Sequence, residues 1–324
     1  MKVLVTGANG FLAANIVREL LLRNFEVKGI VRSKADLRSL EGLTFEIIRG
    51  NITNNEDVEK AVTGCDVVIH AAADTSQRYS DAAPLRKVNV DATRFFVNAS
   101  LKHGVKRFIL ISTGNTIDFG TKENPGHEGN PPGKLFMKSG YALSKIEAEA
   151  VIGEAVKNSG LNAVIVNPTF MIGPYDAKPS SGRIFKMMYP NKIVFIPKGG
   201  KNFTPVNDAA AAICNAIEKG TSGERYLLTG ENLTYLEFLR IVRKGKKTIP
   251  VLIPNWLLIL LGLFGSLLRK IGIRAELSFN NAVILTRNDY YTGKKAIAEL
   301  DMPQTLVPVA VSEAISWFKE HEML

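Results

Sequence analysis

Cysteine and histidine are both scarce in this chain, which has two cysteines and four histidines among 324 residues. Cys65 and Cys214 lie far apart in apolar surroundings. We therefore expect no disulfide framework, and we predict two buried thiols in a protein of a reducing compartment. No histidine stands at metal-ligand spacing from a cysteine, so the sequence predicts no metal site.

The chain also lacks an uninterrupted apolar run long enough to cross a membrane. The segment 249–268 is nearly all apolar and has lysines and arginines on both sides. Prolines and glycines interrupt it, so its apolar runs fall short of the roughly 20 residues that a span needs. We expect a buried or substrate-facing helix in this segment, with contact to a lipid surface or a true span as the alternatives.

A signal-peptide pattern is missing as well, because the first apolar residues lead directly into a glycine turn. We expect a cytoplasmic protein, monomeric or homodimeric, with weak peripheral membrane contact as an alternative location. The formal net charge of +10 suits a phosphorylated cofactor, an acidic substrate or a lipid surface. The basic residues are scattered without a recognition motif, so we expect no nucleic-acid partner.

What the first half contains is a regular alternation of short aliphatic runs and helical stretches, which is typical of βαβ units and a parallel sheet. We expect strands at 2–6, 26–31, 44–49, 67–71, 107–112 and 163–167. We expect helices with apolar stripes at 11–23, 55–62, 85–103 and 140–159. The predicted fold class is α/β, a doubly wound parallel sheet of the Rossmann type with a smaller C-terminal substrate lobe.

The pattern changes after Pro168. The stretch 173–200 is rich in proline and glycine, which predicts a mobile loop region over a substrate site. Beyond it we expect a helix at 208–219, a strand at 225–229 and a helix at 234–244 that starts with a capping box of Thr234 and Glu237. We expect residues 1–170 to form a dinucleotide-binding core, with 203–220 packing back on it. Residues 171–324 form mainly the substrate lobe.

A glycine turn follows the first expected strand. Gly7 has the position of the tight bend in a dinucleotide-binding turn, and Gly10 the position where backbone approaches a pyrophosphate. Ala13 replaces the third glycine of that pattern, where helix and strand pack closely. The helix expected from Phe11 offers its first amides to the diphosphate.

The end of the second expected strand indicates which nicotinamide cofactor fits. An NAD enzyme holds the ribose hydroxyls there with a carboxylate, whereas this chain has Arg32 and Lys34 without an acid between them. Two cations suit a 2′-phosphate, so the sequence favours NADP over NAD. After the third strand, Asn51 is expected to place its amide against the adenine edge.

Tyr141 and Lys145 are four residues apart on an expected helix and therefore share a face. A nearby ammonium favours the phenolate of a tyrosine, which brings its pKa toward the range of proton transfer at neutral pH. We therefore expect Lys145 to lower the pKa of Tyr141. His70, at the end of a buried strand, is expected to be a structural histidine rather than an acid or base.

With these residues in order, the chain resembles the extended short-chain dehydrogenase/reductases, in particular their dihydroflavonol 4-reductase-like and 3β-hydroxysteroid dehydrogenase-like branch. The resemblance covers almost the whole chain. Its motifs are 6–13, 50–52, 70–73, 89–90, 112–113, 141–145, 167–168, 173–174 and Asp208. The departures from the family pattern are Ala13 for glycine, Asn51 for aspartate and Thr113 for the catalytic serine.

The resemblance implies roles for the residues that match the motifs. Tyr141 would exchange a proton with the substrate oxygen, Thr113 would hydrogen-bond that oxygen, with Ser112 as the alternative, and Lys145 would bind the nicotinamide ribose. The expected cofactor-binding residues are Gly7, Asn9, Gly10, Phe11, Leu12, Arg32, Lys34, Asn51, Ile52, Ala71, Ala72, Ala73, Tyr141, Lys145, Pro168 and Thr169. The residues expected to face the substrate are Thr75, Asn115, Phe170 and Tyr175.

These observations favour an NADP-dependent oxidoreductase that transfers hydride between nicotinamide and a ketone or secondary alcohol of a small apolar substrate. The first alternative is an NAD-dependent nucleotide-sugar epimerase or dehydratase. Arg32 and the apolar segment 249–268 argue against it, because such relatives usually have an acid after the second strand and a basic lobe that binds the sugar nucleotide. The second alternative is a non-catalytic NADP-binding regulator, which the retained Thr113, Tyr141 and Lys145 argue against.

Overall fold

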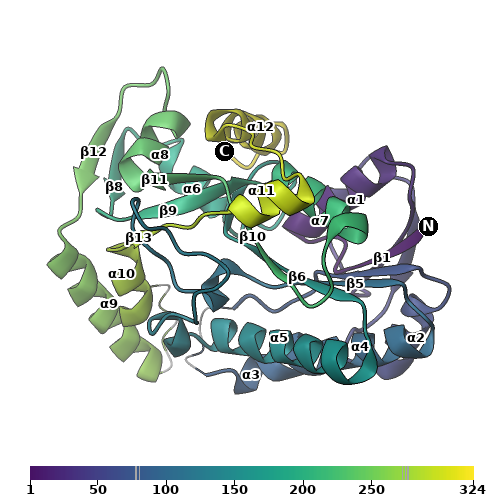
Figure 1. Cartoon of the computed structure of the whole chain (residues 1–324). Helices are drawn as coiled ribbons and strands as arrows, with labels where there is room; N and C mark the ends of the chain where they lie inside the picture. The colour runs from purple at the N-terminus through teal and green to yellow at the C-terminus, as the bar shows by residue number, and fades with distance from the viewer. Residues whose placement is uncertain (77–78, 80, 272, 274, 276) are drawn as a thin grey trace.

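A computed structural model describes residues 1–76, 79, 81–271, 273, 275 and 277–324. Its centre is a sheet of parallel strands in the order β10-β6-β5-β4-β1-β2-β3 (Figure 1). The strands of this sheet are β1 (Lys2–Thr6), β2 (Glu26–Val31), β3 (Glu46–Arg49), β4 (Val67–His70), β5 (Arg107–Ile111), β6 (Ala163–Pro168) and β10 (Arg225–Leu228). The strand order reverses between β1 and β4, and this reversal is where open α/β sheets bind ligands.

Helices cover both faces of this sheet, as expected for a doubly wound fold (Figure 1). One face carries α1 (Phe11–Leu22), α7 (Val206–Lys219) and α11 (Lys294–Leu300), whose buried residues join those of the strands in one core. The other face carries α2 (Asn55–Val62), α4 (Ala92–Lys102) and α5 (Gly140–Ser159), which build a second core. The chain therefore returns to the large sheet after position 170, through α7 and β10. The division into a core of residues 1–170 and a lobe of residues 171–324 stays a prediction.

The helix expected at 85–103 has a more complex form than the sequence predicts. It consists of α3 (Ala83–Arg86), a π-helical turn (Lys87–Asp91) and α4. The π turn contains the buried Asn89. Such turns insert an extra residue into a helix and are frequent at functional sites.

The C-terminal lobe has its own small sheet and a third apolar core. Strand β9 (Gly200–Pro205) pairs with β7 (Phe170–Ile172), β11 (Glu231–Thr234) and β13 (Asn288–Asp289), and β8 (Ile193–Ile196) pairs with β12 (Ile249–Leu252). The helices of the lobe are α6 (Arg183–Met188), α8 (Tyr235–Val242), α9 (Asn255–Lys270), α10 (Phe279–Leu285) and α12 (Val307–Glu320). Helix α8 begins with the predicted capping box of Thr234 and Glu237.

The prediction of a mobile loop at 173–200 is wrong. This stretch contains α6 and β8, and its Phe185, Met188, Val194 and Ile196 are buried in the third core. The prolines and glycines of this stretch do not prevent α6 and β8 from forming, because the apolar residues between them pack against a core.

The prediction of one buried or substrate-facing helix at 249–268 is also wrong. Residues 249–252 form β12, Pro254 ends the connection, and α9 follows from Asn255. Most of the large side chains of α9 are exposed, among them Trp256, with 67% of its surface exposed. Among the described residues, none of the helices has both the length and the apolar character needed to cross a membrane.

Candidate active site

The glycine turn after β1 lies directly against the chain that leaves β4. Gly7 has a φ of +62°, and a Cβ atom built on it would lie 3.0 Å from the Cα atom of Ala72. A larger residue at this position is therefore strained by both its backbone conformation and its surroundings. Thr6 connects the same two strands, because its Oγ1 accepts a hydrogen bond of 2.9 Å from the amide of Ala72.

Helix α1 starts beside this turn. Gly10 is its N-cap, and within the described part of the chain no side chain caps the helix or places an acid in its first turn. The first amides, those of Phe11 and Leu12, and the positive end of the helix dipole suit a diphosphate. Ala13 is buried against the core, which agrees with its expected packing position.

The side-chain amide of Asn9 is bonded to the protein backbone. Its Nδ2 donates to the backbone carbonyl of Asp36 over 2.9 Å, and its own carbonyl accepts from Ser39 Oγ over 2.9 Å. These bonds tie the glycine turn to the segment that follows β2. The side chain of Asn9 therefore shapes the cofactor turn.

The carboxyl end of β2 is strongly cationic. Arg32 and Lys34 are exposed there, and Arg49 of the neighbouring β3 donates from Nη1 to the carbonyl of Ser33 over 2.7 Å. Asp36, the next acid along the chain, pairs with Arg38 at 2.8 Å, and this partner lowers the pKa of Asp36 to about 2. Arg49 escaped the sequence analysis, although the pairing of parallel strands places it opposite Val31.

The other predicted cofactor-binding residues, near β3 and β4, differ in their surroundings. Asn51 is exposed, and its Oδ1 accepts from the amide of Thr53 over 3.0 Å, so its side chain closes a local turn. Ile52 packs against the second core. Ala71, Ala72 and Ala73 are half-buried, and they leave little side-chain bulk between the glycine turn and β4.

His70 is a structural residue in this fold. It is buried, its Nδ1 lies 3.0 Å from Thr6 Oγ1, and its ring lies 4.8 Å from that of Phe96. Burial, with a smaller contribution from Lys145, lowers the pKa of His70 to about 3. The imidazole is therefore neutral at physiological pH, as a structural role requires.

Thr113, Tyr141 and Lys145 are all buried at the carboxyl end of β5, where the Tyr141 side chain bonds to Thr113 and Lys145 bonds to Ile111. Burial raises the pKa of Tyr141 to about 12, and a hydrogen bond with the Thr113 side chain acts in the opposite direction. The expectation of a lowered pKa for Tyr141 is therefore wrong for this structure, because the cost of burying a phenolate outweighs the hydrogen bond with Thr113. The phenol is held in its protonated form.

Lys145 is the most deeply buried of the three. Its Nζ donates to the carbonyl of Ile111 over 2.7 Å. Burial lowers the pKa of Lys145 to about 8, while the charge of Glu149 raises it. The ammonium and the amine are thus both accessible near neutral pH.

Glu149 is a site residue that the sequence analysis missed. It lies one turn beyond Lys145 on α5, and its Oε1 accepts from Thr116 Oγ1 and Asn167 Nδ2, both over 2.8 Å. It also accepts from Ser112 Oγ, and its Oε2 lies 3.2 Å from Arg225 Nη2. The i+4 spacing from Lys145 was the available signal. Ser112 is therefore engaged by Glu149. The hydroxyl that bonds to the Tyr141 side chain is that of Thr113.

Asn89 fixes the chain that follows β4 against helix α5. From the π turn, its Nδ2 donates to the carbonyl of Asp74 and to Ser144 Oγ, both over 2.9 Å, and its Oδ1 accepts from the amide of Asp74 over 2.7 Å. Thr75, a predicted substrate residue, follows directly and is exposed. Asn89 thereby connects the chain after β4 to helix α5.

Two more predicted residues lie beside Thr113. A Cβ atom on Gly114 would lie 3.2 Å from Thr169 Cγ2, so Pro168 and Thr169 at the end of β6 adjoin this turn. Thr169 Oγ1 is itself bonded to Asn202 Oδ1 over 2.6 Å. Asn115 is half-buried, and its amide donates to Thr113 Oγ1 over 3.3 Å.

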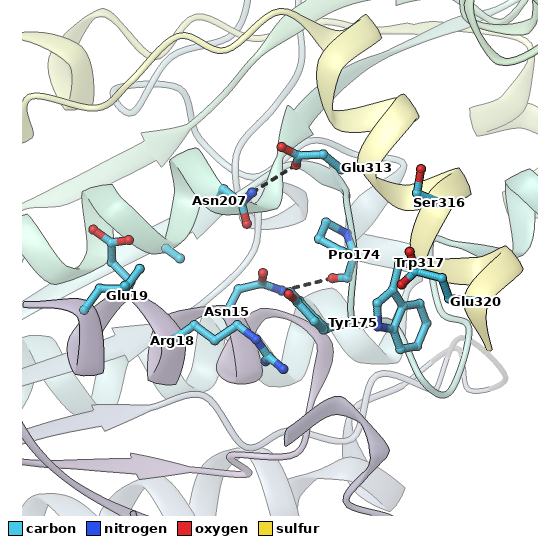
Figure 2. Close-up of a pocket in the computed structure, with 12 residues that line it drawn as sticks. Asn15, Arg18, Glu19, Pro174, Tyr175, Asn207, Glu313, Ser316, Trp317 and Glu320 are labelled. Carbon is cyan, nitrogen blue, oxygen red and sulfur yellow. Dashed lines mark hydrogen bonds between the residues drawn. The ribbon is translucent and has the colours of Figure 1, made fainter. Parts of the chain in front are cut away.

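Phe170 and Tyr175, both predicted to face the substrate, differ in their surroundings. Phe170 packs at the edge of the third core, with its ring 5.6 Å from that of Phe203. Tyr175 lies in a separate pocket of about 520 Å³, where the Arg18 guanidinium stacks 3.4 Å above its ring (Figure 2). Trp317 lies beside it, at 6.0 Å between ring centres. The described lining of this pocket does not include Tyr141.

The geometry fits a nicotinamide dinucleotide in three respects: an uncapped helix start beside a glycine turn, a cationic strand end, and a buried hydroxyl, phenol and amine at the sheet edge. Among the described residues there is no cluster of histidine, cysteine and acidic side chains that could hold a metal ion.

Comparison with known proteins agrees with this geometry. The sequence model of the NAD dependent epimerase/dehydratase family matches residues 3–228. The chain is 32% identical to sterol demethylase protein B of Methylococcus capsulatus, with 100% of both chains covered. It is 28% identical to 3-beta-hydroxysteroid dehydrogenase of Mycolicibacterium neoaurum, covering 98% of this chain and 92% of the relative.

Among solved structures, the fold is similar to the crystal structure of gox2253, with a TM-score of 0.86, 28% identity and 99% of both chains covered. The matched part contains the glycine turn, the cationic strand end and the buried tyrosine and lysine. The chain belongs to the NAD dependent epimerase/dehydratase family, the extended short-chain dehydrogenase/reductases, which use a nicotinamide cofactor.

Proposed function

We propose that this enzyme is an NADP-dependent oxidoreductase that interconverts a ketone and a secondary alcohol on an apolar substrate, with Tyr141 as its general acid and base. The observation that carries this proposal is the buried arrangement of Thr113, Tyr141 and Lys145. A phenol held in its protonated form is prepared to donate a proton to a carbonyl oxygen.

The three side chains divide the work at one substrate oxygen. The nicotinamide supplies or accepts the hydride at the carbon atom. The Thr113 hydroxyl donates a hydrogen bond that orients the substrate oxygen, and the Tyr141 hydroxyl transfers a proton to it as negative charge develops. Lys145, one helical turn after Tyr141 and fixed to Ile111, would stabilise in its ammonium form the phenolate that remains.

Preference for NADP rests on the carboxyl end of β2. Arg32 and Lys34 are exposed, and Arg49 holds the backbone between them. The acid closest along the chain, Asp36, is engaged by Arg38. A 2′-phosphate would meet cations at this position, whereas the carboxylate of Asp36 is already paired with Arg38 and is less suited to accept hydrogen bonds from two ribose hydroxyls.

An apolar substrate is supported by the relatives and by the lobe. Two of the relatives, those reported above, carry a sterol and a steroid in their names. The half-buried Phe170 stands directly after Thr169 at the entrance to the lobe, where an aromatic ring suits an apolar ring system better than a sugar diphosphate.

An NAD-dependent epimerase of nucleotide sugars is the second candidate, because the family whose model matches this chain includes epimerases. The cationic end of β2 counts against it. A non-catalytic regulator is the third candidate, and the intact trio of Thr113, Tyr141 and Lys145 counts against that role.

The test is a spectrophotometric assay of NADPH and NADH oxidation with a 3-ketosteroid, an aromatic ketone and a UDP-hexose. We expect NADPH oxidation with an apolar ketone and its loss in Tyr141→Phe. Interconversion of UDP-hexoses without net NADPH oxidation would instead establish the epimerase. Cofactor binding without turnover of any substrate of either class would favour the regulator.

A further inference from the structure

Helix α9 directs two glycines and one leucine into the protein and most of its other large apolar residues outward. Leu258, Gly262 and Gly265 are buried. The exposed large residues of α9 are Trp256, Leu260, Leu261, Leu263, Phe264 and Leu267, from 48% exposed for Leu261 to 67% for Trp256. An ordinary surface helix has the opposite arrangement, with polar residues facing water.

The two glycines fix this orientation. A Cβ atom on Gly262 would lie 2.5 Å from Ala282 Cβ of α10, and one on Gly265 would lie 2.0 Å from the carbonyl of Leu277. The close approach of α9 to the chain around α10 therefore requires glycine on the inner side. Rotating α9 to bury its large residues would drive them into this contact.

The strand pair before α9 adds apolar surface of the same kind. Ile193 and Phe195 of β8 are 53% and 64% exposed, and Ile249 and Leu252 of β12 are both 46% exposed. Val194 and Ile196, at the alternate positions of β8, are buried. Helix α9 and the β8–β12 pair occupy the same edge of the molecule, at the left of Figure 1.

Basic residues border this apolar surface. Lys192 precedes β8, and its carbonyl accepts from the amide of Ile249 over 2.8 Å. Lys244 and Lys247 precede β12, and all three lysines are exposed. Arg269 stands at the far end of α9. The whole chain carries a formal net charge of +10.

We propose that the outer face of α9, together with the β8–β12 pair, docks on the surface of an anionic lipid bilayer. Trp256, Phe264 and the leucines enter the boundary between headgroups and acyl chains, while the bordering lysines contact anionic headgroups. Burial of this face in lipid removes from water the apolar area that the fold leaves uncovered. The helix lies in the interface and does not span it.

Charge favours lipid over a second copy of the chain. A two-fold symmetric dimer through this face would bring Lys192, Lys244, Lys247 and their symmetry mates to one interface, and like charges there oppose association. An anionic bilayer has the complementary sign. The inference goes beyond the catalytic proposal, because it depends on no cofactor or substrate.

The first test is flotation of the full chain with vesicles of phosphatidylcholine alone or with about 30% phosphatidylserine. We expect the anionic vesicles to carry the protein, with release at high salt, and at least about tenfold weaker binding for a variant with Leu260→Ser, Leu263→Ser and Phe264→Ser. The matched control is Leu22→Ser with Leu306→Ser, two exposed leucines elsewhere (78% and 63%), which should bind like the parent chain.

A second readout follows Trp256 directly. The chain has two tryptophans, and Trp317 is buried, so Trp317→Phe leaves Trp256 as the only tryptophan, which can be excited selectively over the tyrosines. Vesicles with phosphatidylserine should shift its emission to the blue, and lipids brominated on the acyl chains should quench it. Unchanged emission, or flotation of the triple-serine variant equal to that of the parent, would overturn the proposal. So would self-association through this face, seen by sedimentation velocity, without vesicle binding.

Discussion

Lys145 donates a hydrogen bond from Nζ to the backbone carbonyl of Ile111 over 2.7 Å. Ile111 is the last residue of β5, and Thr113 follows it closely. The bond therefore ties helix α5, which carries Tyr141, to the strand end that carries Thr113. Since the three side chains are buried, their relative geometry is fixed before a substrate enters, which is the condition for effective proton transfer.

The hydroxyl of Thr113 is expected to be required, and its methyl group is not. Thr113→Ser keeps the donor and should retain turnover within a few-fold. Thr113→Val keeps the shape and should lower kcat by roughly 10²-fold or more, because the substrate oxygen loses a hydrogen bond in the transition state. Steady-state kinetics of the two variants with one ketone make the comparison. Equal activities would remove Thr113 from the mechanism.

Arg32→Ala should weaken NADPH binding by about tenfold and leave NADH binding nearly unchanged, because the guanidinium contacts only the 2′-phosphate in the proposed arrangement. Calorimetric titration with both cofactors measures this difference. Arg23→Ala is the control: Arg23 directly follows α1, at the end of the helix remote from the glycine turn, and pairs with Glu19. An equal loss for both cofactors in Arg32→Ala would mean that the cation does not recognise the phosphate.

The glycine turn, the strands of the parallel sheet and the i,i+4 spacing of Tyr141 and Lys145 could be predicted from sequence, because each leaves a pattern in neighbouring residues. Glu149 and Arg49 could not be placed, since their roles depend on partners from β6, from β10 and from the segment after β2 that only the folded sheet brings near. The pKa of Tyr141 was predicted in the wrong direction because spacing reveals the neighbouring cation but not the extent of burial.

The orientation of α9 could not be predicted from the sequence either. A helix that is apolar on all sides carries no periodic signal for its inner face. The contact of Gly262 and Gly265 with the chain around α10 decides that face, and it depends on residues distant in sequence. The segment was therefore assigned to the interior, whereas the fold leaves its large residues in contact with solvent.

Glu149→Gln should lower the pKa of Lys145 further below its present value of about 8, since the charge of Glu149 is what raises it. If turnover needs the ammonium form, activity falls as pH rises through about 8 in the parent enzyme, and this alkaline limb moves to lower pH in the variant. A pH profile of kcat/KM tests it. Glu147→Gln, whose partner Arg86 is at the surface, should leave the limb in place, and an identical profile for Glu149→Gln would exclude the coupling.

His70 should make stability depend on pH in the acid range. Its pKa is about 3 in the folded chain against 6.5 ordinarily, so between these values the unfolded chain binds more protons. The free energy of unfolding is therefore expected to decline as pH falls from 6.5 toward 3, by an amount on the order of a few kcal/mol at most. Urea unfolding at pH 7 and pH 5 should show a smaller difference in His70→Asn than in the parent. His127→Asn, on an exposed loop, is the control, and an unchanged difference in His70→Asn would contradict the assignment.

The central claim, hydride transfer to a ketone with Tyr141 as the acid, is tested most directly by mass spectrometry of the product formed from NADPH deuterated at C4 of the nicotinamide. The account predicts that a 3-ketosteroid or another apolar ketone becomes an alcohol with one deuterium on the carbinol carbon, and that Tyr141→Phe still binds the cofactor but yields at least about 10²-fold less product. An alcohol that forms at the parent rate in Tyr141→Phe would contradict the claim. So would epimerised UDP-hexose that retains its own hydrogen, in the absence of any deuterated alcohol.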